Sequence, residues 1–251
     1  MEDRPSLQIA GTGIVERAKS ILLQPKTEWP RVAAETTEPT KVLTGYALPL
    51  IAIGPIASLI GSQLFPLSVL GITYKPSITA AVATAVVSFV LAIVSLFVIA
   101  FVANFLSPKF GGKDNFPATF RLVAYSMTAA WLAGIFGLMP ALAILAILGL
   151  YSLYLFYLGA TPVLGVPQDK AVGFTAVTVI GAIVVNIVVY VIAGTITGAF
   201  GLAAGAAALS AAPETATVDL GELGKVEING DTATVTVDGQ EVEVTVPPQE
   251  E

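Results

Sequence analysis

The sequence predicts an all-α polytopic membrane protein with five transmembrane helices and a small β-rich C-terminal tail. Hydrophobic residues make up 55% of the 251-residue chain, charged residues make up 12%, and the mean hydropathy is +0.82. Soluble domains carry about 25% charged residues, so this chain has too little polar material to cover a water-facing surface. A bilayer is crossed by about 20 apolar residues. Four longer stretches contain no Asp, Glu, Lys or Arg: 42–74, 76–108, 122–168 and 171–213.

The N-terminal segment, residues 1–41, contains the pattern of an amphipathic helix. Apolar residues between positions 14 and 23 share one helical face: Ile14, Ala18, Ile21 and Leu22. Trp29 follows, and its ring is of the kind that settles at headgroup level. The helix either lies in the plane of the cytoplasmic membrane surface or packs on the cytoplasmic ends of the bundle, because both arrangements bury the same face.

The charge-free stretches predict five spans, over residues 42–64, 78–106, 120–139, 141–164 and 171–200. Pro49 and Pro55 should kink the first span, because each lacks a backbone N–H. The third and fourth spans share one stretch, which as a single helix would measure about 70 Å at a rise of about 1.5 Å per residue. That stretch must turn within a bilayer core of about 30 Å, and Met139-Pro140 is the natural corner.

The positive charges predict the topology, because cytoplasmic loops are enriched in Lys and Arg. With the N-terminus inside, the cytoplasmic flanks hold Lys26, Arg31, Lys41, Lys109, Lys113, Arg121 and Lys170. The opposite side holds only Lys75 and Lys225. We therefore expect a cytoplasmic N-terminus and a C-terminus on the other side. Residues 1–20 lack the apolar core of a signal peptide, so insertion should depend on the first internal span.

The C-terminal region has a different pattern. We expect a linker over 201–224 and a small β-meander over 225–247, where Val and Ile alternate with polar residues around Asn229-Gly230 and Asp238-Gly239. Residues 213–251 hold 1 basic and 10 acidic residues, which argues against nucleic acid as a partner. The acidic residues of the meander do not fit a calcium-loop spacing, so solvated strand faces are the preferred interpretation.

The composition excludes several kinds of chemistry. Without Cys or His, the chain has no disulfide framework, no thiolate nucleophile, no Ser-His-Asp triad and no imidazole metal site. No ionisable residue is expected in the middle of a span. Arg121 is at the start of the third, where it should reach the cytoplasmic interface. We therefore predict no catalytic, cofactor-binding or metal-binding residue. Asn186, near the middle of the fifth span, should bridge helices.

Small residues form two stripes that predict close helix packing. In the second span the stripe is Ala81, Ala85, Ser88, Ala92 and Ser95. Around the end of the fifth span it is Gly194, Gly198, Gly201 and Gly205. Both stripes fit packing within the bundle, and the glycine stripe also fits self-association. A third group forms an interfacial aromatic belt in the fourth span: Tyr151, Tyr154 and Tyr157.

Short phrases along the chain resemble the Yip-one (Ypt-interacting-protein) domain, in particular its prokaryotic branch. Those ahead of and within the first span are Leu22-Leu23-Gln24-Pro25, Glu28-Trp29-Pro30, Gly45-Tyr46, Leu48-Pro49 and Ile53-Gly54-Pro55. The others are Phe110-Gly111-Gly112, Asn115-Phe116, Ala124-Tyr125-Ser126 and Pro167-Gln168-Asp169-Lys170-Ala171. The resemblance covers about residues 13–200 and implies five spans after a cytoplasmic N-terminus. Eukaryotic relatives act in vesicle traffic and bind Rab-type GTPases and one another. The acidic tail departs from the family's short C-terminus, so nothing is implied about its role.

Three functional hypotheses follow. The first is a non-enzymatic protein that organises the membrane or acts as an adaptor, with the lipid bilayer, a second copy or other membrane proteins as partners. The second is a transporter or channel component, with the kinked first span and Asn186 lining a polar path. The third, an enzyme, is confined to Ser, Thr, Tyr, Lys or carboxylate chemistry at the membrane surface. The prokaryotic phrasing points to a bacterial cytoplasmic (inner) membrane.

Overall fold

The computed structural model divides the chain into two units, residues 1–197 and 198–251, each described by itself. The structure describes residues 13–65, 67–69, 72–210, 215–219, 225–229, 232–237 and 240–245. Side chains are described for fewer of these, and in the second unit for very few.

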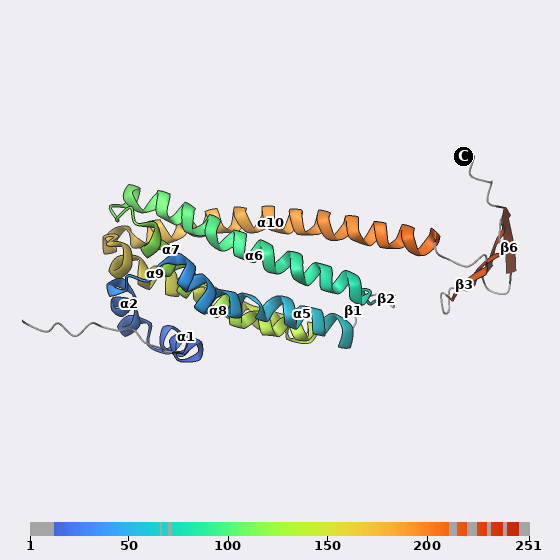
Figure 1. Cartoon of the computed structure of the whole chain (residues 1–251), viewed down its shortest axis with the longest axis horizontal. Helices are drawn as coiled ribbons and strands as arrows, with labels where there is room; N and C mark the ends of the chain where they lie inside the picture. Colours follow the sequence, from blue (N-terminus) through green and yellow to red (C-terminus); the bar gives the residue numbers. More distant parts are fainter. Residues whose placement is uncertain are drawn as a thin grey trace, which may run out of the picture. The chain divides into compact units, whose positions relative to one another are not determined.

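Helices dominate the first unit (Figure 1). In chain order its α-helices are α1 (Ile14–Leu23), α2 (Pro25–Ala34), α3 (Pro39–Val42), α4 (Leu48–Ile51), α5 (Ile53–Leu64), α6 (Ile78–Leu106), α7 (Phe116–Ser126), α8 (Thr128–Ala133), α9 (Tyr151–Leu164) and α10 (Gln168–Ser210), the last of which runs on into the second unit. A π-helix, η1 (Leu43–Ala47), and three 3₁₀ helices, η2 (Ser107–Phe110), η3 (Gly134–Leu138) and η4 (Pro140–Leu150), complete the helical elements. Strands β1 (Leu67–Val69) and β2 (Ile72–Tyr74) form a hairpin between α5 and α6.

Five helical segments of the described chain are long and apolar enough to cross a membrane, which confirms the predicted count. They are Pro39–Leu64, Ile78–Phe110, Phe116–Leu138, Pro140–Leu164 and Gln168–Thr195. The first is irregular where the sequence predicts a kink. The π-helix η1 precedes Pro49, and α4 and α5 are separated at Ala52, ahead of Pro55. The corner between the third and fourth spans falls at Met139, whose backbone is extended.

The core of the first unit lies where α2, α7, α9 and the start of α10 meet. The large side chains that are almost fully buried include Trp29, Val32, Phe120, Leu122, Val123, Leu155, Leu164, Val166 and Phe174. Toward the β1–β2 hairpin, the buried residues of α5 and α6 are small, such as Ala57, Gly61 and Ala81. One end of the bundle is therefore packed by large side chains and the other by small ones.

Helix α6 has two contrasting faces. Large apolar side chains recur mostly every fourth residue on the exposed face: Val82, Val86, Val90, Val94, Val98, Phe101 and Phe105. Such a stripe suits contact with lipid chains. The small residues of the predicted stripe face the bundle, where Ala81 and Ser95 are buried and the three between them are partly buried.

The second unit contains strands β3 (Thr215–Asp219), β4 (Lys225–Asn229), β5 (Thr232–Val237) and β6 (Gln240–Thr245), paired antiparallel in that order. Val226 pairs with Val235, and Val235 with Val242. Strand β3 lies inside the range expected to be a linker. The two predicted Gly turns fall outside the described residues. A folded β-rich tail over 225–247 stays a prediction, because most side chains of its faces are outside the description.

Candidate functional site

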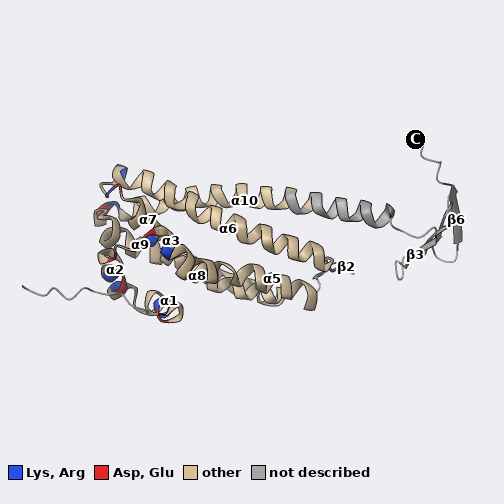
Figure 2. Ribbon diagram, in the orientation of Figure 1, with Lys and Arg blue, Asp and Glu red and all other residues tan. Residues whose placement is uncertain are grey.

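Charged side chains of the first unit gather at one end of the bundle (Figure 2). Ten Lys and Arg lie between residues 13 and 197, and nine of them belong to α1, α2, α3, η2 with its following turn, α7 and the first turn of α10. The tenth, Lys75, follows β2 at the opposite end. We call the two ends the charged end and the hairpin end.

Arg17 of α1 lies between two carboxylates at the charged end. Its Nη1 donates a 2.5 Å hydrogen bond to Glu28 Oε1 of α2, and its Nη2 lies 2.7 Å from Glu35 Oε1, just after α2. The Glu35 contact is an ion pair without hydrogen-bond alignment. None of the three side chains is more than 9% exposed. These contacts hold α1 against α2, because each buried charge is shielded from water and is compensated by its partner on the other segment.

Burial and charge oppose each other on the two central groups. Burial raises the pKa of Glu35 above its ordinary value of 4.5, and attraction to Arg17 reduces that rise without cancelling it. For Arg17, burial acts to lower the pKa, but Glu35, Tyr125 and Glu28 together outweigh it, and the pKa of Arg17 is raised. Arg17 therefore stays charged, and Glu35 is the carboxyl whose protonation the packing favours.

Tyr125 of α7 closes the other side of this group. The Arg17 guanidinium carbon lies 5.3 Å from the centre of its ring, and the Tyr125 hydroxyl donates a 3.5 Å bond to Glu35 Oε2. Tyr46 packs edge-on against Tyr125, with ring centres 4.9 Å apart. The Thr128 hydroxyl donates to the Tyr125 carbonyl at 2.6 Å, so the Tyr46 hydroxyl is the donor in its 2.7 Å bond to Thr128. The first and third spans are thereby tied to the ion pairs.

Arg121, one turn before Tyr125 on α7, is buried below the loop that follows α2. Its Nη1 donates a 2.9 Å bond to the Thr37 carbonyl, while its Nε has no hydrogen-bond partner among the described residues. The charges of Arg121 and Arg17 both attract the carboxylate of Glu35, and Arg17 also pairs with Glu28. We call these four residues and Tyr125 the Arg17 cluster.

Trp29 anchors α2 beside the Arg17 cluster. The side chain is 1% exposed and lies against α9 at Gly159, where a Cβ would be 2.8 Å from the Trp29 ring and would also overlap Leu122. Only a glycine admits the indole there without movement. Packing of the Trp29 ring against α9 therefore holds the N-terminal helices to the bundle, in addition to the ion pairs of Arg17.

A second set of contacts at the charged end joins the turn after η2 to the turn before α10. The Lys113 N–H donates a 2.8 Å bond to the Leu164 carbonyl, and Gly111 has φ +82°, a backbone conformation that favours glycine. A Cβ at Gly112 would lie 2.7 Å from Val166. Nearby, Asn104 Nδ2 donates a 2.7 Å bond to Asp114. Hydrogen bonds and close packing therefore join these two turns.

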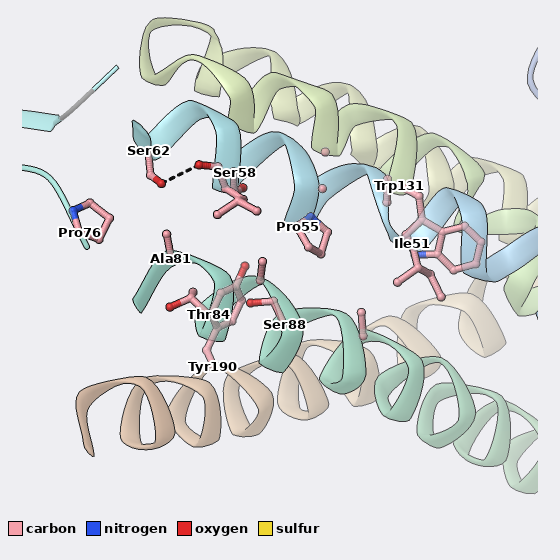
Figure 3. Close-up of a pocket in the computed structure, with 16 residues that line it drawn as sticks. Ile51, Pro55, Ser58, Ser62, Pro76, Ala81, Thr84, Ser88, Trp131 and Tyr190 are labelled. Carbon is pink, nitrogen blue, oxygen red and sulfur yellow. Dashed lines mark hydrogen bonds between the residues drawn. The ribbon is translucent and has the colours of Figure 1, made fainter. Parts of the chain in front are cut away.

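The bundle is hollowed toward the hairpin end. A cavity of about 610 Å³, which we call the α5–α6 cavity, has Pro55, Ser58 and Ser62 of α5 on one wall and Ala85 and Ser88 of α6 on the other (Figure 3). No Asp, Glu, Lys or Arg lines it. Much of the small-residue stripe on α6 therefore lines an open space and does not touch α5 throughout.

The structure places the predicted interface residues in different surroundings. In α1, Ala18 and Ile21 are buried, and Ile14 and Leu22 are partly buried against the core. Trp29 and Arg121 are buried inside the protein, covered by α9 and by the loop after α2, so a place at headgroup level stays a prediction for both. Of the belt tyrosines, Tyr151 and Tyr154 are exposed, with ring centres 5.5 Å apart, and Tyr157 is partly buried. The Tyr151 hydroxyl donates a 3.0 Å bond to the Leu22 carbonyl.

The predicted packing residues of the fifth span are also placed. Asn186 Nδ2 donates a 2.8 Å bond to the Ala182 carbonyl of its own helix, so this bond does not bridge helices. A Cβ at Gly194 or Gly198 would meet nothing within 4 Å. The surroundings of Gly201 and Gly205 lie outside the described side chains.

Sequence reasoning missed the Arg17 cluster as a site. Glu28, Tyr46 and Tyr125 belong to phrases that carry the family resemblance, and the structure brings them together. Arg17 and Glu35 belong to none of those phrases, and in a segment rich in charged residues nothing in the sequence marks them. Among the described residues no group of three or more His, Cys, Asp or Glu is arranged to hold a metal ion.

Comparison with known families gives one match. A family model described as the Yip1 domain matches residues 19–190, which is more than half of the chain. No curated protein and no solved structure matches. The match includes every member of the Arg17 cluster except Arg17 itself.

Proposed function

This chain belongs to the Yip1 domain family of integral, multi-pass membrane proteins, and from that premise we propose that it is a non-enzymatic organiser or adaptor. Its partners would dock on α1 and α2, which we call the N-terminal platform. The observation that carries the proposal is the buried Arg17–Glu28–Glu35 contact, because it makes these helices part of the bundle. Binding to a fixed surface costs less conformational entropy than binding that must first order a free N-terminal segment.

The outward surface of the platform is suited to contact with another molecule. Val15 and Leu23 are 81% and 68% exposed, and Lys19, Lys26 and Arg31 are exposed beside them. Exposed apolar side chains accompanied by basic ones fit an acidic protein surface or the headgroup region of the bilayer, although Glu16 is also exposed on α1.

We place the platform at the cytoplasmic face of the membrane. Helix α6 has 29 residues, about 43 Å at a rise of about 1.5 Å per residue, so it is longer than a hydrocarbon core of about 30 Å. The Tyr151–Leu22 bond puts the end of α1 beside the start of α9. At the same rise α9 is about 20 Å long, so the end of α1 lies about 20 Å along the bundle from the end of α9 at the charged end. In Figure 1 the long helices run across the picture while α1 is seen nearly end-on, so α1 is steeply inclined to them, which supports an in-plane helix at the interface.

The charge distribution supports this orientation. The basic residues of the charged end predict a cytoplasmic location. In this proposal the Arg17 cluster stands at or beyond the membrane surface, and the C-terminus lies on the opposite side of a bacterial cytoplasmic membrane.

Site-specific photocrosslinking in native membranes tests the proposal. A photoreactive residue in place of Lys19 or Lys26 should give discrete protein adducts, and one in place of Val90 on the lipid-facing stripe should give none. Arg17→Ala should remove the platform adducts while the protein remains in the membrane. Platform positions that crosslink only to lipid would overturn the adaptor role.

A second copy of the chain is the partner we propose for α10. The spacing of Gly194, Gly198, Gly201 and Gly205 supports it, as do the exposed side chains of Ile187 and Val191 on the same helix. The chain contains no Cys, so a single Gly198→Cys change would report self-contact by disulfide crosslinking. Crosslinked dimers should form at Gly198→Cys and not at a matched Val90→Cys position.

The α5–α6 cavity favours one alternative, a transporter or channel component. Pro55 lines the cavity, as expected for a kinked span that opens a path, but Asn186 does not. Flux of small solutes into proteoliposomes tests this alternative. A leak that Ala85→Leu blocks would support it, and the absence of any leak would exclude it.

A further inference from the structure

The α5–α6 cavity is lined by residues of the first, second and third candidate membrane spans and by Tyr190 of the fifth, so we expect lipid chains around it. Its volume of about 610 Å³ is within the range of about 300–1,000 Å³ typical of small-molecule sites. The wall on α6 is hollow because small residues replace the large ones of the exposed face: Ala81, Ala85, Ser88 and Ala92. A space of this size beside the bilayer will be filled by an apolar or amphiphilic molecule.

The lining is polar at one end and apolar at the other (Figure 3). Ser62, Pro76 and Thr84 lie toward the hairpin end, whereas Ile51 and Trp131 lie toward the charged end. The Ser62 hydroxyl donates to Leu59 O at 2.9 Å and the Thr84 hydroxyl to Ala80 O at 2.8 Å, so neither demands a polar ligand. Such a gradient fits an amphiphile whose polar part faces the hairpin end.

Three hydroxyls line the cavity between these ends, those of Ser58, Ser88 and Tyr190 (Figure 3). None of them makes a hydrogen bond within the part of the chain that the structure describes, although a Cβ at Gly137 would lie 2.8 Å from the Ser58 hydroxyl. A lipid whose chain reached Trp131 would pass these hydroxyls.

One charged residue directly precedes a lining residue at the polar end of the cavity. Lys75 is exposed, adjoins the lining residue Pro76, and has no salt bridge among the described residues. Gln63 Nε2 donates a 3.1 Å bond to the Pro76 carbonyl, which holds this segment to the end of α5. Lys75 is the only charged residue between positions 42 and 108. Its charge complements the phosphate of a phospholipid.

From the volume, the polarity gradient and Lys75 we infer that the α5–α6 cavity binds one glycerophospholipid. One acyl chain runs along α6 to Trp131, the ester region meets Ser58 and Ser88, and the phosphate lies at Lys75. The site is independent of the N-terminal platform, so it stands or falls separately from the adaptor role.

The two tryptophans provide the test, because Trp131 lines the cavity and Trp29 is buried at the other end. In detergent, phosphatidylglycerol with a dibrominated acyl chain is titrated into Trp29→Phe, which leaves Trp131 as the only tryptophan. We expect saturable quenching of the emission. Trp131→Phe, which leaves Trp29, should not be quenched.

Two matched substitutions on α6 separate the cavity from the general lipid surface. Ala85→Leu puts a larger side chain into the path of the acyl chain along α6 and should abolish saturable quenching in the Trp29→Phe background. Val86→Leu, on the exposed face, should leave it unchanged. Lys75→Gln should weaken binding by about threefold, the effect of one exposed ion pair.

Native mass spectrometry of the otherwise unchanged protein gives a second measurement. One retained phospholipid is expected, and Ala85→Leu should lose it while its thermal unfolding stays cooperative. Two results would overturn the inference. Quenching that never saturates and is equal in Ala85→Leu would indicate surface lipid only. Quenching of Trp131 by aqueous acrylamide, with none by brominated chains, would indicate a water-filled solute path.

Discussion

At the charged end, Phe120, Arg121 and Leu122 of the third span are at most 4% exposed, whereas farther along the same span Trp131 and Gly134 line an open cavity. Helix α6 shows the same change. Ala100 and Ala103 are fully buried toward the charged end, and Ala85 and Ala92 border the cavity toward the hairpin end. A single set of helices is therefore tightly closed at one end and open at the other.

The difference follows from the solvent of each end. If the charged end stands in water, removal of apolar surface from water drives its packing, and large side chains close around the Arg17 cluster. Within hydrocarbon that driving force is absent, so contacts between helices depend on small residues. At the hairpin end, α5 meets the third span through glycines: Gly54 faces Gly134, and a Cβ at Gly61 would overlap the Leu138 carbonyl. The same α5 leaves a space toward α6.

The largest expected effect comes from removing the central charge of the closed end. Arg17→Ala leaves Glu28 and Glu35 buried without their shared partner, and we expect a loss of about 3–5 kcal/mol in the free energy that holds the platform to the bundle. Chemical unfolding in detergent would measure any global loss. The rate of trypsin cleavage after Lys19 and Lys26 would report local release of the platform.

Arg31→Ala is the matched control for this change. Arg31 also contacts Glu28, at 3.3 Å, but its side chain is 74% exposed. Exposed pairs contribute about 0–1 kcal/mol, so the control should stay close to the unmodified protein. Equal effects of the two substitutions would show that the Arg17 cluster does not hold the platform.

A methyl group at Gly159 is expected to have the next largest effect. Gly159→Ala puts a Cβ against the Trp29 ring and Leu122, and overpacking of this kind costs about 1–3 kcal/mol. Thermal unfolding followed by tryptophan fluorescence would measure the loss. Gly45→Ala, where a Cβ meets nothing within 4 Å, should be close to neutral. If both substitutions changed the unfolding free energy equally, the Trp29 ring would not be tightly packed against Gly159.

The spans could be predicted from sequence because each is a long run without charge, and a bilayer leaves little choice of structure for such a run. The corner at Met139-Pro140 followed from length alone. The apolar face of α1 was also predictable from helical spacing, and Ala18 and Ile21 are buried. What spacing could not decide was which surface would cover that face.

The Arg17 cluster could not be predicted, because its members come from distant parts of the chain. Glu35 and Tyr125 are 90 positions apart, and their contact depends on how α2 folds back over α7. For the same reason the sequence could not show that the loop after α2 covers Arg121. The α5–α6 cavity was equally hidden, since small residues at helical spacing predict contact and not a gap.

A smaller effect is expected from pH, and it concerns Glu35. Because burial raises the pKa of Glu35, the folded protein takes up a proton more readily than the unfolded chain. The stability from this group is therefore fully present below pH 4.5 and is lost as the pH rises through the raised value. The change is at most about 1.4 kcal/mol per pH unit for one proton.

Glu35→Gln provides the reference for the pH series. The difference in unfolding free energy between the unmodified protein and the variant should fall as the pH rises from 4.5, and it should then become constant. A difference that grew with pH would mean that the ion pair with Arg17 outweighs burial. The charged end would then be stabilised by the ionised form of Glu35.

The smallest expected effect tests the hairpin end with a change, Ala to Leu, that should destabilise the charged end. Ala100→Leu adds a large side chain where α6 is fully buried, and overpacking there should cost about 1–3 kcal/mol. Ala85→Leu makes the same change on the same helix, but the new side chain enters the α5–α6 cavity, so the unfolding free energy should shift by less than about 0.5 kcal/mol. Parallel unfolding of the two variants in one detergent measures the contrast directly. A loss at Ala85 equal to that at Ala100 would mean that the helices meet where the cavity is described, and the hairpin end would be as closed as the charged end.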